Sequence, residues 1–179
     1  SLDEMASTLS HVSEILTIQR AYTADRGEIL GRKVDLRRVV DDALEMQAAS
    51  LRSRGISVIR GYPETPLTVV GDRTKLVRVA MNLFRNAAEA FDRAPESGQN
   101  RRIEVTASRS NQLCVIKIED NGPGFTEGTD SSKGSSGGLG LRAVHKLLEA
   151  HGGGLWVSPG ETGGATITFW LPCKEEWAE

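Results

Sequence analysis

The sequence predicts an α+β domain, a two-layer α/β sandwich in which a mixed sheet carries its helices on one face. The main observation is the order of the periodic segments, which is helix, strand, strand, helix, hairpin, helix and two closing strands. The second is composition, because 39% hydrophobic and 26% charged residues in a chain of 179 are typical of a globular protein.

Charge and hydropathy exclude several classes of function. A net charge of −2 gives no general attraction to nucleic acid or to an anionic membrane, so neither is expected as a partner. No run approaches the ~20 apolar residues of a membrane span, and the acidic start is unlike a signal peptide. We therefore expect a cytoplasmic piece of a longer protein, with a membrane anchor of the full-length protein left open. Cys114 and Cys173 are predicted to be small buried side chains.

Residues 1–30 are predicted to form a unit separate from residues 31–179. Apolar residues recur at helical spacing up to about residue 26, so we expect one helix that packs on another helix, in this chain or in a second copy. Its apolar positions are Met5, Leu9, Val12, Ile15, Leu16 and Ile18.

The second unit opens after a short linker with a helix over 34–53, for which Asp35 is the expected N-cap. Further helices are expected over 73–93 and 139–150, and a loop over 95–100. His145 and His151 are expected at the surface or at a helix end. Strands are predicted over 56–59, 67–70, 103–108, 113–119, 155–157 and 165–171.

The stretch from 116 to 141 suits a nucleotide. A strand ends in Asp120, whose carboxylate can accept a hydrogen bond from an exocyclic amine. A Gly-Pro-Gly turn follows, then a polar segment over 127–137 that has too little apolar content to pack and should act as a lid. Gly137 then opens a helix, whose free N–H groups suit phosphates. The alternative is an ordinary strand, surface loop and helix.

Two amides point to a metal site. Asn82 and Asn86 are four residues apart and share one face of the predicted helix over 73–93. An amide oxygen is a good ligand for Mg²⁺, which proteins hold through one or two oxygens together with phosphates and water. The alternative is a solvated face that carries an Arg85–Glu89 ion pair.

Together these segments resemble the ATP-binding catalytic domain of sensor histidine kinases, in the GHKL superfamily. The segment 82–90, NLFRNAAEA, resembles the N box, and EDNGPGF at 119–125 and GGLGL at 137–141 resemble the two glycine boxes. GGAT at 163–166 resembles the last glycine motif, and VDLRRVVDDALEMQ with GISV resembles the entry helix and first strand. The resemblance implies the Bergerat fold, with ATP and Mg²⁺ as cofactors.

The resemblance also implies roles for single residues. Asn86 would be the Mg²⁺ ligand, with Asn82 beside it. The family often has a basic residue at the position of Glu89, so Arg85 or Lys133 would supply the positive charge instead. Asp120 would accept from the adenine amine. The remaining nucleotide contacts would come from the glycines Gly122 and Gly124, from the helix start Gly138, Leu139, Gly140 and Leu141, and from the hydroxyl of Thr166.

The family transfers the γ-phosphoryl group of ATP to a histidine on a dimerising helical hairpin, and from there to the receiver domain of a response regulator. The residues after His11 are not those of an acceptor, since an acidic residue normally follows directly. Residues 1–30 instead resemble the second hairpin helix, so the acceptor is expected upstream of this chain. His11 as the acceptor is the alternative, and the full protein is expected to be a homodimer.

Two other functions stay open. A gyrase-, HSP90- or MutL-like ATPase would carry a glutamate base four residues before the metal asparagine, where this chain has Asn82. The second open function is a nucleotide-binding regulator without catalysis, because Glu89 stands where the family often has a basic residue.

Overall fold

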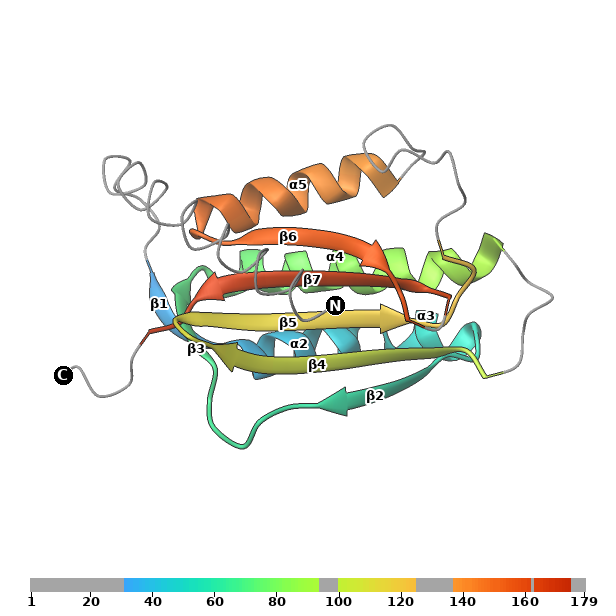
Figure 1. The fold of residues 1–179 in the computed structure, drawn as a ribbon, viewed down its shortest axis with the longest axis horizontal. Helices are drawn as coiled ribbons and strands as arrows, with labels where there is room; N and C mark the ends of the chain where they lie inside the picture. Colours follow the sequence, from blue (N-terminus) through green and yellow to red (C-terminus); the bar gives the residue numbers. More distant parts are fainter. Residues whose placement is uncertain (1–30, 94–99, 125–136, 162, 175–179) are drawn as a thin grey trace.

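The structure is a computed structural model that describes residues 31–93, 100–124, 137–161 and 163–174 (Figure 1). Several predictions therefore lie outside the described residues: the N-terminal helix with His11, most of the loop over 95–100, and nearly all of the proposed lid with Lys133. Within the described ranges, no helix is long and apolar enough to cross a membrane.

The centre of the domain is a five-stranded mixed sheet in the order β2-β4-β5-β7-β6 (Figure 1). β2 runs parallel to β4, and the other neighbours are antiparallel. This confirms the predicted mixed sheet and its β4–β5 hairpin. The strands are β2 (Ser57–Gly61), β4 (Arg102–Ser110), β5 (Leu113–Asp120), β6 (Gly154–Pro159) and β7 (Ala165–Pro172).

Helices cover one face of this sheet. They are α2 (Leu36–Met46), α3 (Ala48–Ser53), α4 (Arg73–Ala90) with the 3₁₀ turn η1 (Phe91–Arg93), and α5 (Gly137–Ala150). Alternate strand residues such as Ile116 and Phe169 join Val40, Phe84 and Leu148 from the helices in one buried core. The single helix predicted over 34–53 is broken at Gln47 into α2 and α3.

A second, two-stranded sheet of β1 (Arg32–Asp35) and β3 (Thr68–Gly71) lies at the entrance to α2. β1 covers the end of the predicted linker and the first two residues of the helix predicted over 34–53, so that helix begins later than predicted, at Leu36. Three residues of β1 are charged and only Val34 is buried. Short strands of this composition carry no alternating apolar signal.

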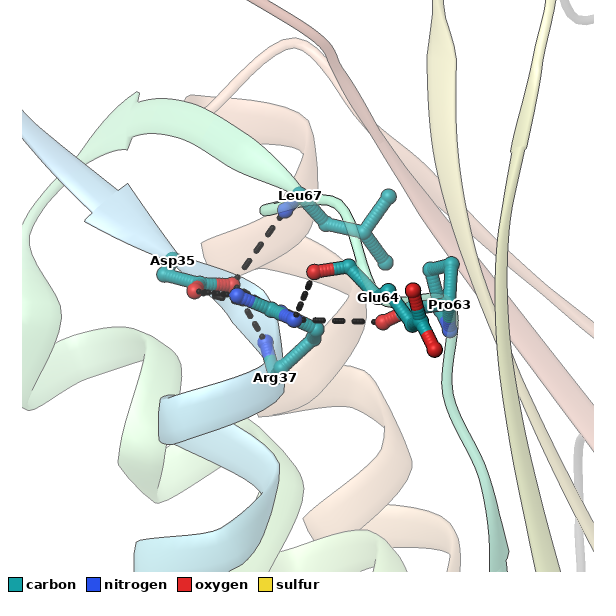
Figure 2. Close-up of polar contacts among 5 residues, drawn as sticks. All are labelled: Asp35, Arg37, Pro63, Glu64 and Leu67. Atoms are coloured by element: carbon teal, nitrogen blue, oxygen red, sulfur yellow. Dashed lines mark hydrogen bonds and ion pairs between the residues drawn. The ribbon is translucent and has the colours of Figure 1, made fainter.

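Asp35 is the N-cap of α2, as predicted, and it also joins the start of α2 to the residue before β3 (Figure 2). Its Oδ1 accepts from the N–H of Arg37 at 3.1 Å and of Leu67 at 3.3 Å. The Arg37 guanidinium pairs with Asp35 and donates to the carbonyls of Pro63 and Glu64. Burial would raise the pKa of Asp35, but these hydrogen bonds outweigh it and hold the pKa below its usual value.

The two cysteines form a disulfide, which corrects the prediction of two independent buried thiols. Cys114 lies near the start of β5, and Cys173 follows β7. Their Cα atoms are 5.4 Å apart, within the usual range for a disulfide. The backbone N–H groups of Cys173 and Lys174 donate to the carbonyls of Gln112 and Thr68, respectively. The disulfide and these hydrogen bonds together hold the segment after β7 against both sheets.

We expect reduction of this disulfide to destabilise the domain by about 2–4 kcal/mol, because the bond closes a long loop between residues 59 apart. Urea unfolding with and without a thiol reductant measures the difference. The Cys114→Ser/Cys173→Ser double variant should show no response to the reductant. Equal unfolding midpoints for the oxidised and reduced wild-type protein would contradict the expectation.

Candidate nucleotide-binding site

The predicted site residues of three elements gather at one end of the domain, at the right in Figure 1. β5 ends there in Asp120, and the second half of α4 carries Asn82 and Asn86. α5 runs antiparallel to α4, so its first residue, Gly137, lies at the same end. Segments far apart in sequence are thus brought together as the motif spacing predicted.

Asp120 is a buried carboxylate, with a relative exposure of 4%. Its Oδ1 accepts from the N–H of Gly122 at 3.0 Å and, at 3.4 Å, from that of Ala165 on β7. Burial raises the pKa of Asp120, while these hydrogen bonds and nearby Arg93 oppose the rise. A carboxylate held this way can accept a further hydrogen bond from a bound ligand.

Two glycine turns are in direct contact at Asp120. A Cβ on Gly164 would lie 1.8 Å from the backbone oxygen of Asp120, and a Cβ on Gly124 would lie 2.4 Å from the carbonyl oxygen of Gly163. Gly124 also has φ +73°, which favours glycine. The turn before β7 and the turn after β5 therefore require glycine in order to pack together. This contact joins the two glycine motifs into one wall of the site.

Asn121 has a role that the sequence analysis missed. Its Nδ2 donates to the carbonyl of Asn100 at 2.6 Å, and its Oδ1 accepts from the N–H of Arg102 at 2.7 Å. These bonds fasten the turn after Asp120 to the start of β4. A polar residue directly after a strand-ending acid is the signal that could have suggested this.

The second half of α4 carries a set of polar side chains. Asn82 Oδ1 accepts from Arg85 Nη2 at 3.1 Å, and Glu89 lies within electrostatic range of Arg54. The predicted alternative of an Arg85–Glu89 pair is thus not the arrangement observed. Asn86 is different, because its Nδ2 is buried and has no hydrogen-bond partner among the residues that the structure describes.

A buried polar group without a partner costs stability, and such groups often serve a bound ligand. The oxygen and nitrogen of an amide occupy nearly equivalent positions, so a rotation of the side chain would present its oxygen at this point. The Asn86 amide therefore fits a role as an oxygen ligand for Mg²⁺. Among the described residues, no group of three or more His, Cys, Asp or Glu side chains could hold a metal instead.

The start of α5 supplies the fourth part of the site. Gly137, Gly138, Leu139 and Gly140 form its first turn, and Leu141 follows and packs against the core. The N–H groups of a first turn have no intrahelical acceptor, and the helix dipole is positive there. This end of α5 is suited to phosphate oxygens.

Thr166 is not brought to the site. It pairs with Glu119 across β5 and β7, and its hydroxyl donates to Glu119 Oε2 at 3.2 Å. Successive strand residues face opposite sides, so Glu119 and Thr166 lie on the sheet face away from Asp120. The prediction of a Thr166 hydroxyl near the base is wrong, and the inward position belongs to Ala165.

The raised pKa of Asp120 leads to a prediction on stability. The folded domain holds the Asp120 proton more tightly than the unfolded chain does. The free energy of unfolding therefore falls as pH rises from the ordinary pKa of 3.8 to the higher pKa of the folded domain. We therefore expect Asp120→Asn to raise the melting temperature of the nucleotide-free domain at pH 7. Its amide oxygen can still accept from Gly122 and Ala165. The gain should shrink as pH is lowered toward 4, and an equal or lower melting temperature at pH 7 would contradict this.

Comparison with known proteins identifies the family. Residues 71–175 match the model of the family described as histidine kinase-, DNA gyrase B-, and HSP90-like ATPase. The chain belongs to this family. The match includes α4, β5, α5 and β7, which carry the candidate site. Membership in a family of ATPases carries nucleotide use with it.

Sensor proteins from several bacteria are similar to this chain in sequence. The chain is 28% identical to the sensor protein FixL of Bradyrhizobium diazoefficiens, over 98% of this chain and 36% of that protein. It is 33% identical to the sensor histidine kinase ZraS of Escherichia coli K12, over 78% of this chain and 30% of that protein. The chain thus spans about a third of the length of these relatives.

Solved structures of the family show the same fold. The catalytic domain of the histidine kinase ThkA superposes with a TM-score of 0.69 at 24% identity, over 82% of this chain and 99% of that one. The mycobacterial sensor histidine kinase MprB gives a TM-score of 0.64 at 26% identity, over 80% and 99%. The two-layer sandwich predicted from the sequence is therefore confirmed.

Proposed function

We propose that this chain is the catalytic and ATP-binding region of a sensor histidine kinase, which binds ATP·Mg²⁺ and transfers the γ-phosphoryl group to a histidine. The observation that carries the proposal is the meeting of Asp120, Asn86 and the start of α5 at one end of the domain. Similarity to ZraS and FixL supports this reading over a gyrase-like ATPase.

Each site residue then has a task. The buried carboxylate of Asp120 accepts from the adenine amine, and the turns at Gly122 and Gly124 allow backbone to approach the base. Gly138, Leu139, Gly140 and Leu141 lie at the helix start that faces the phosphates. Asn86 would hold Mg²⁺, which neutralises charge on the phosphate oxygens when bound, with Asn82 and Arg85 beside it.

The chain's own residues contribute position and charge rather than a nucleophile. Position 82 holds an amide that cannot remove a proton from water, so the site has no general base where a gyrase-like ATPase would need one. Catalysis in this scheme is alignment of the γ-phosphoryl group with an incoming histidine nitrogen, together with stabilisation of charge. The acceptor histidine is proposed to lie upstream in the longer protein.

In the longer protein we propose a homodimer, with residues 1–30 belonging to the helical hairpin and residues 31–179 to the catalytic unit. The phosphohistidine would pass its phosphoryl group to an aspartate of a response-regulator receiver domain. In one structure with a similar fold, the histidine kinase ThkA is in complex with a response regulator protein.

Phosphoryl transfer with γ-labelled ATP tests the proposal. The longer protein should take up acid-labile label, while this chain of 179 residues alone binds ATP and stays unlabelled. Label on this chain that disappears in His11→Gln would make His11 the acceptor. Steady release of phosphate without a labelled histidine would favour an ATPase, and nucleotide binding with neither would favour a regulator without catalysis.

A further inference from the structure

His151 is a buried imidazole that the proposed reaction does not use. It directly follows α5 and has a relative exposure of 9%, whereas His145, six residues earlier, is exposed and pairs with Glu149 at 3.1 Å. The prediction of a helix-end position for His151 is correct, but the residue is in the interior rather than at the surface. A buried polar ring needs partners.

Both ring nitrogens of His151 have such partners. Nδ1 lies 2.7 Å from the carbonyl oxygen of Leu147, and Nε2 lies 3.1 Å from the backbone nitrogen of Asp72. A carbonyl can only accept and a backbone N–H can only donate. The ring hydrogen is therefore assigned to Nδ1, which donates to Leu147, while Nε2 accepts from Asp72.

The second partner lies far away in the sequence, at the start of α4. Asp72 is the N-cap of α4, and its side chain accepts from the N–H of Lys75. Its own N–H precedes the helix and is satisfied by His151. Gly71 makes room for the ring, since a Cβ there would lie 2.5 Å from Cδ2 of His151. The end of α5 is thereby fixed to the beginning of α4.

This contact sets how two antiparallel helices lie along each other. With the last turn of α5 held at Asp72, the first turn, at Gly137, is placed beside the second half of α4, where Asn86 lies (Figure 1). We infer that His151 is a positioning residue that holds the phosphate-binding start of α5 in place opposite Asn86. The inference rests on the proposed function.

The base and phosphate parts of the site depend on this contact to different degrees. Asp120 and Gly122 are held by β5, β7 and the start of β4, through bonds that do not involve α5. The start of α5 depends on the packing of α5 on α4 and β6. Loss of the His151 contact should therefore weaken binding of the phosphates and leave binding of the adenine unchanged.

The test compares adenosine with ADP·Mg²⁺. Binding is measured by NMR or calorimetric titration for the wild-type chain, His151→Ala, and His151→Gln, whose amide can donate to Leu147 and accept from Asp72. Val40→Ala, in the buried face of α2, is the control for general destabilisation. We expect His151→Ala to bind adenosine like the wild type and ADP·Mg²⁺ at least fivefold more weakly. His151→Gln should recover part of this loss, and Val40→Ala should lose neither ligand.

A second variant reaches the same contact from the other side. Gly71→Ala keeps the imidazole but displaces it, so it should reproduce the selective loss even if His151→Ala does not fold. In the double variant Gly71→Ala/His151→Ala, the losses of ADP·Mg²⁺ affinity should not add, because each substitution removes the same contact. Equal weakening of both ligands, no weakening of either, or additive losses would overturn the inference. Failure of the wild-type chain to bind either ligand would instead reject the proposed function.

Discussion

Asp120→Ala is expected to weaken ATP and ADP binding at least tenfold while the domain stays folded. The carboxylate is buried and is the acceptor proposed for the adenine amine. Without it, the amine would be left unpaired in a desolvated pocket, at a cost of about 1–3 kcal/mol. Calorimetric titration measures the affinities, and the far-ultraviolet circular dichroism spectrum checks the fold.

Glu119→Ala is the matched control for this variant. It removes the neighbouring carboxylate, which lies on the opposite face of the sheet and bonds to Thr166 and Lys117. Nucleotide affinity should be unchanged in Glu119→Ala. An affinity in Asp120→Ala equal to that of the wild type would remove Asp120 from the site.

Asn86→Ala is expected to make ATP affinity nearly insensitive to Mg²⁺. The variant removes the only protein oxygen proposed for the metal, so the ion could bind only through the phosphates and water. The same substitution removes a buried amide nitrogen that has no partner within the described part of the chain, so the free energy of unfolding should change little. The measurement is a set of ATP titrations with and without Mg²⁺.

The control for Asn86 is Asn111→Gly. Asn111 lies in the turn between β4 and β5, at the far end of the sheet, and its φ of 56° suits glycine. This variant should show the wild-type response to Mg²⁺. A full response in Asn86→Ala would show that the metal is held by other groups.

Much of the fold could be predicted from the sequence, because its elements carry strong local patterns. β4 alternates apolar and polar residues from Ile103 to Ser108, and α4 carries its apolar stripe along 18 residues. The N-cap at Asp35 was predicted from local chemistry alone. In contrast, β1 has only one buried residue and is created by pairing with β3, which no local pattern reveals.

The errors in the prediction have a common physical origin in contacts between distant segments. Thr166 and Ala165 differ by one residue, and only the register of β7 on β5 shows which of them faces Asp120. His151 bonds to Asp72, 79 residues away, and Cys114 bonds to Cys173, 59 residues away. Spacing along the chain predicts motifs well but does not predict these tertiary pairs.

The measurement that tests the central claim most directly is a titration of the wild-type chain with ATP·Mg²⁺ and GTP·Mg²⁺ under the same conditions. Guanine presents a carbonyl oxygen where adenine presents its amine, so the Asp120 carboxylate would face a second acceptor. We expect ATP to bind at least tenfold more tightly than GTP, and Asp120→Ala to lose most of this preference. Equal affinities for the two nucleotides, or no binding of ATP, would contradict the proposed site.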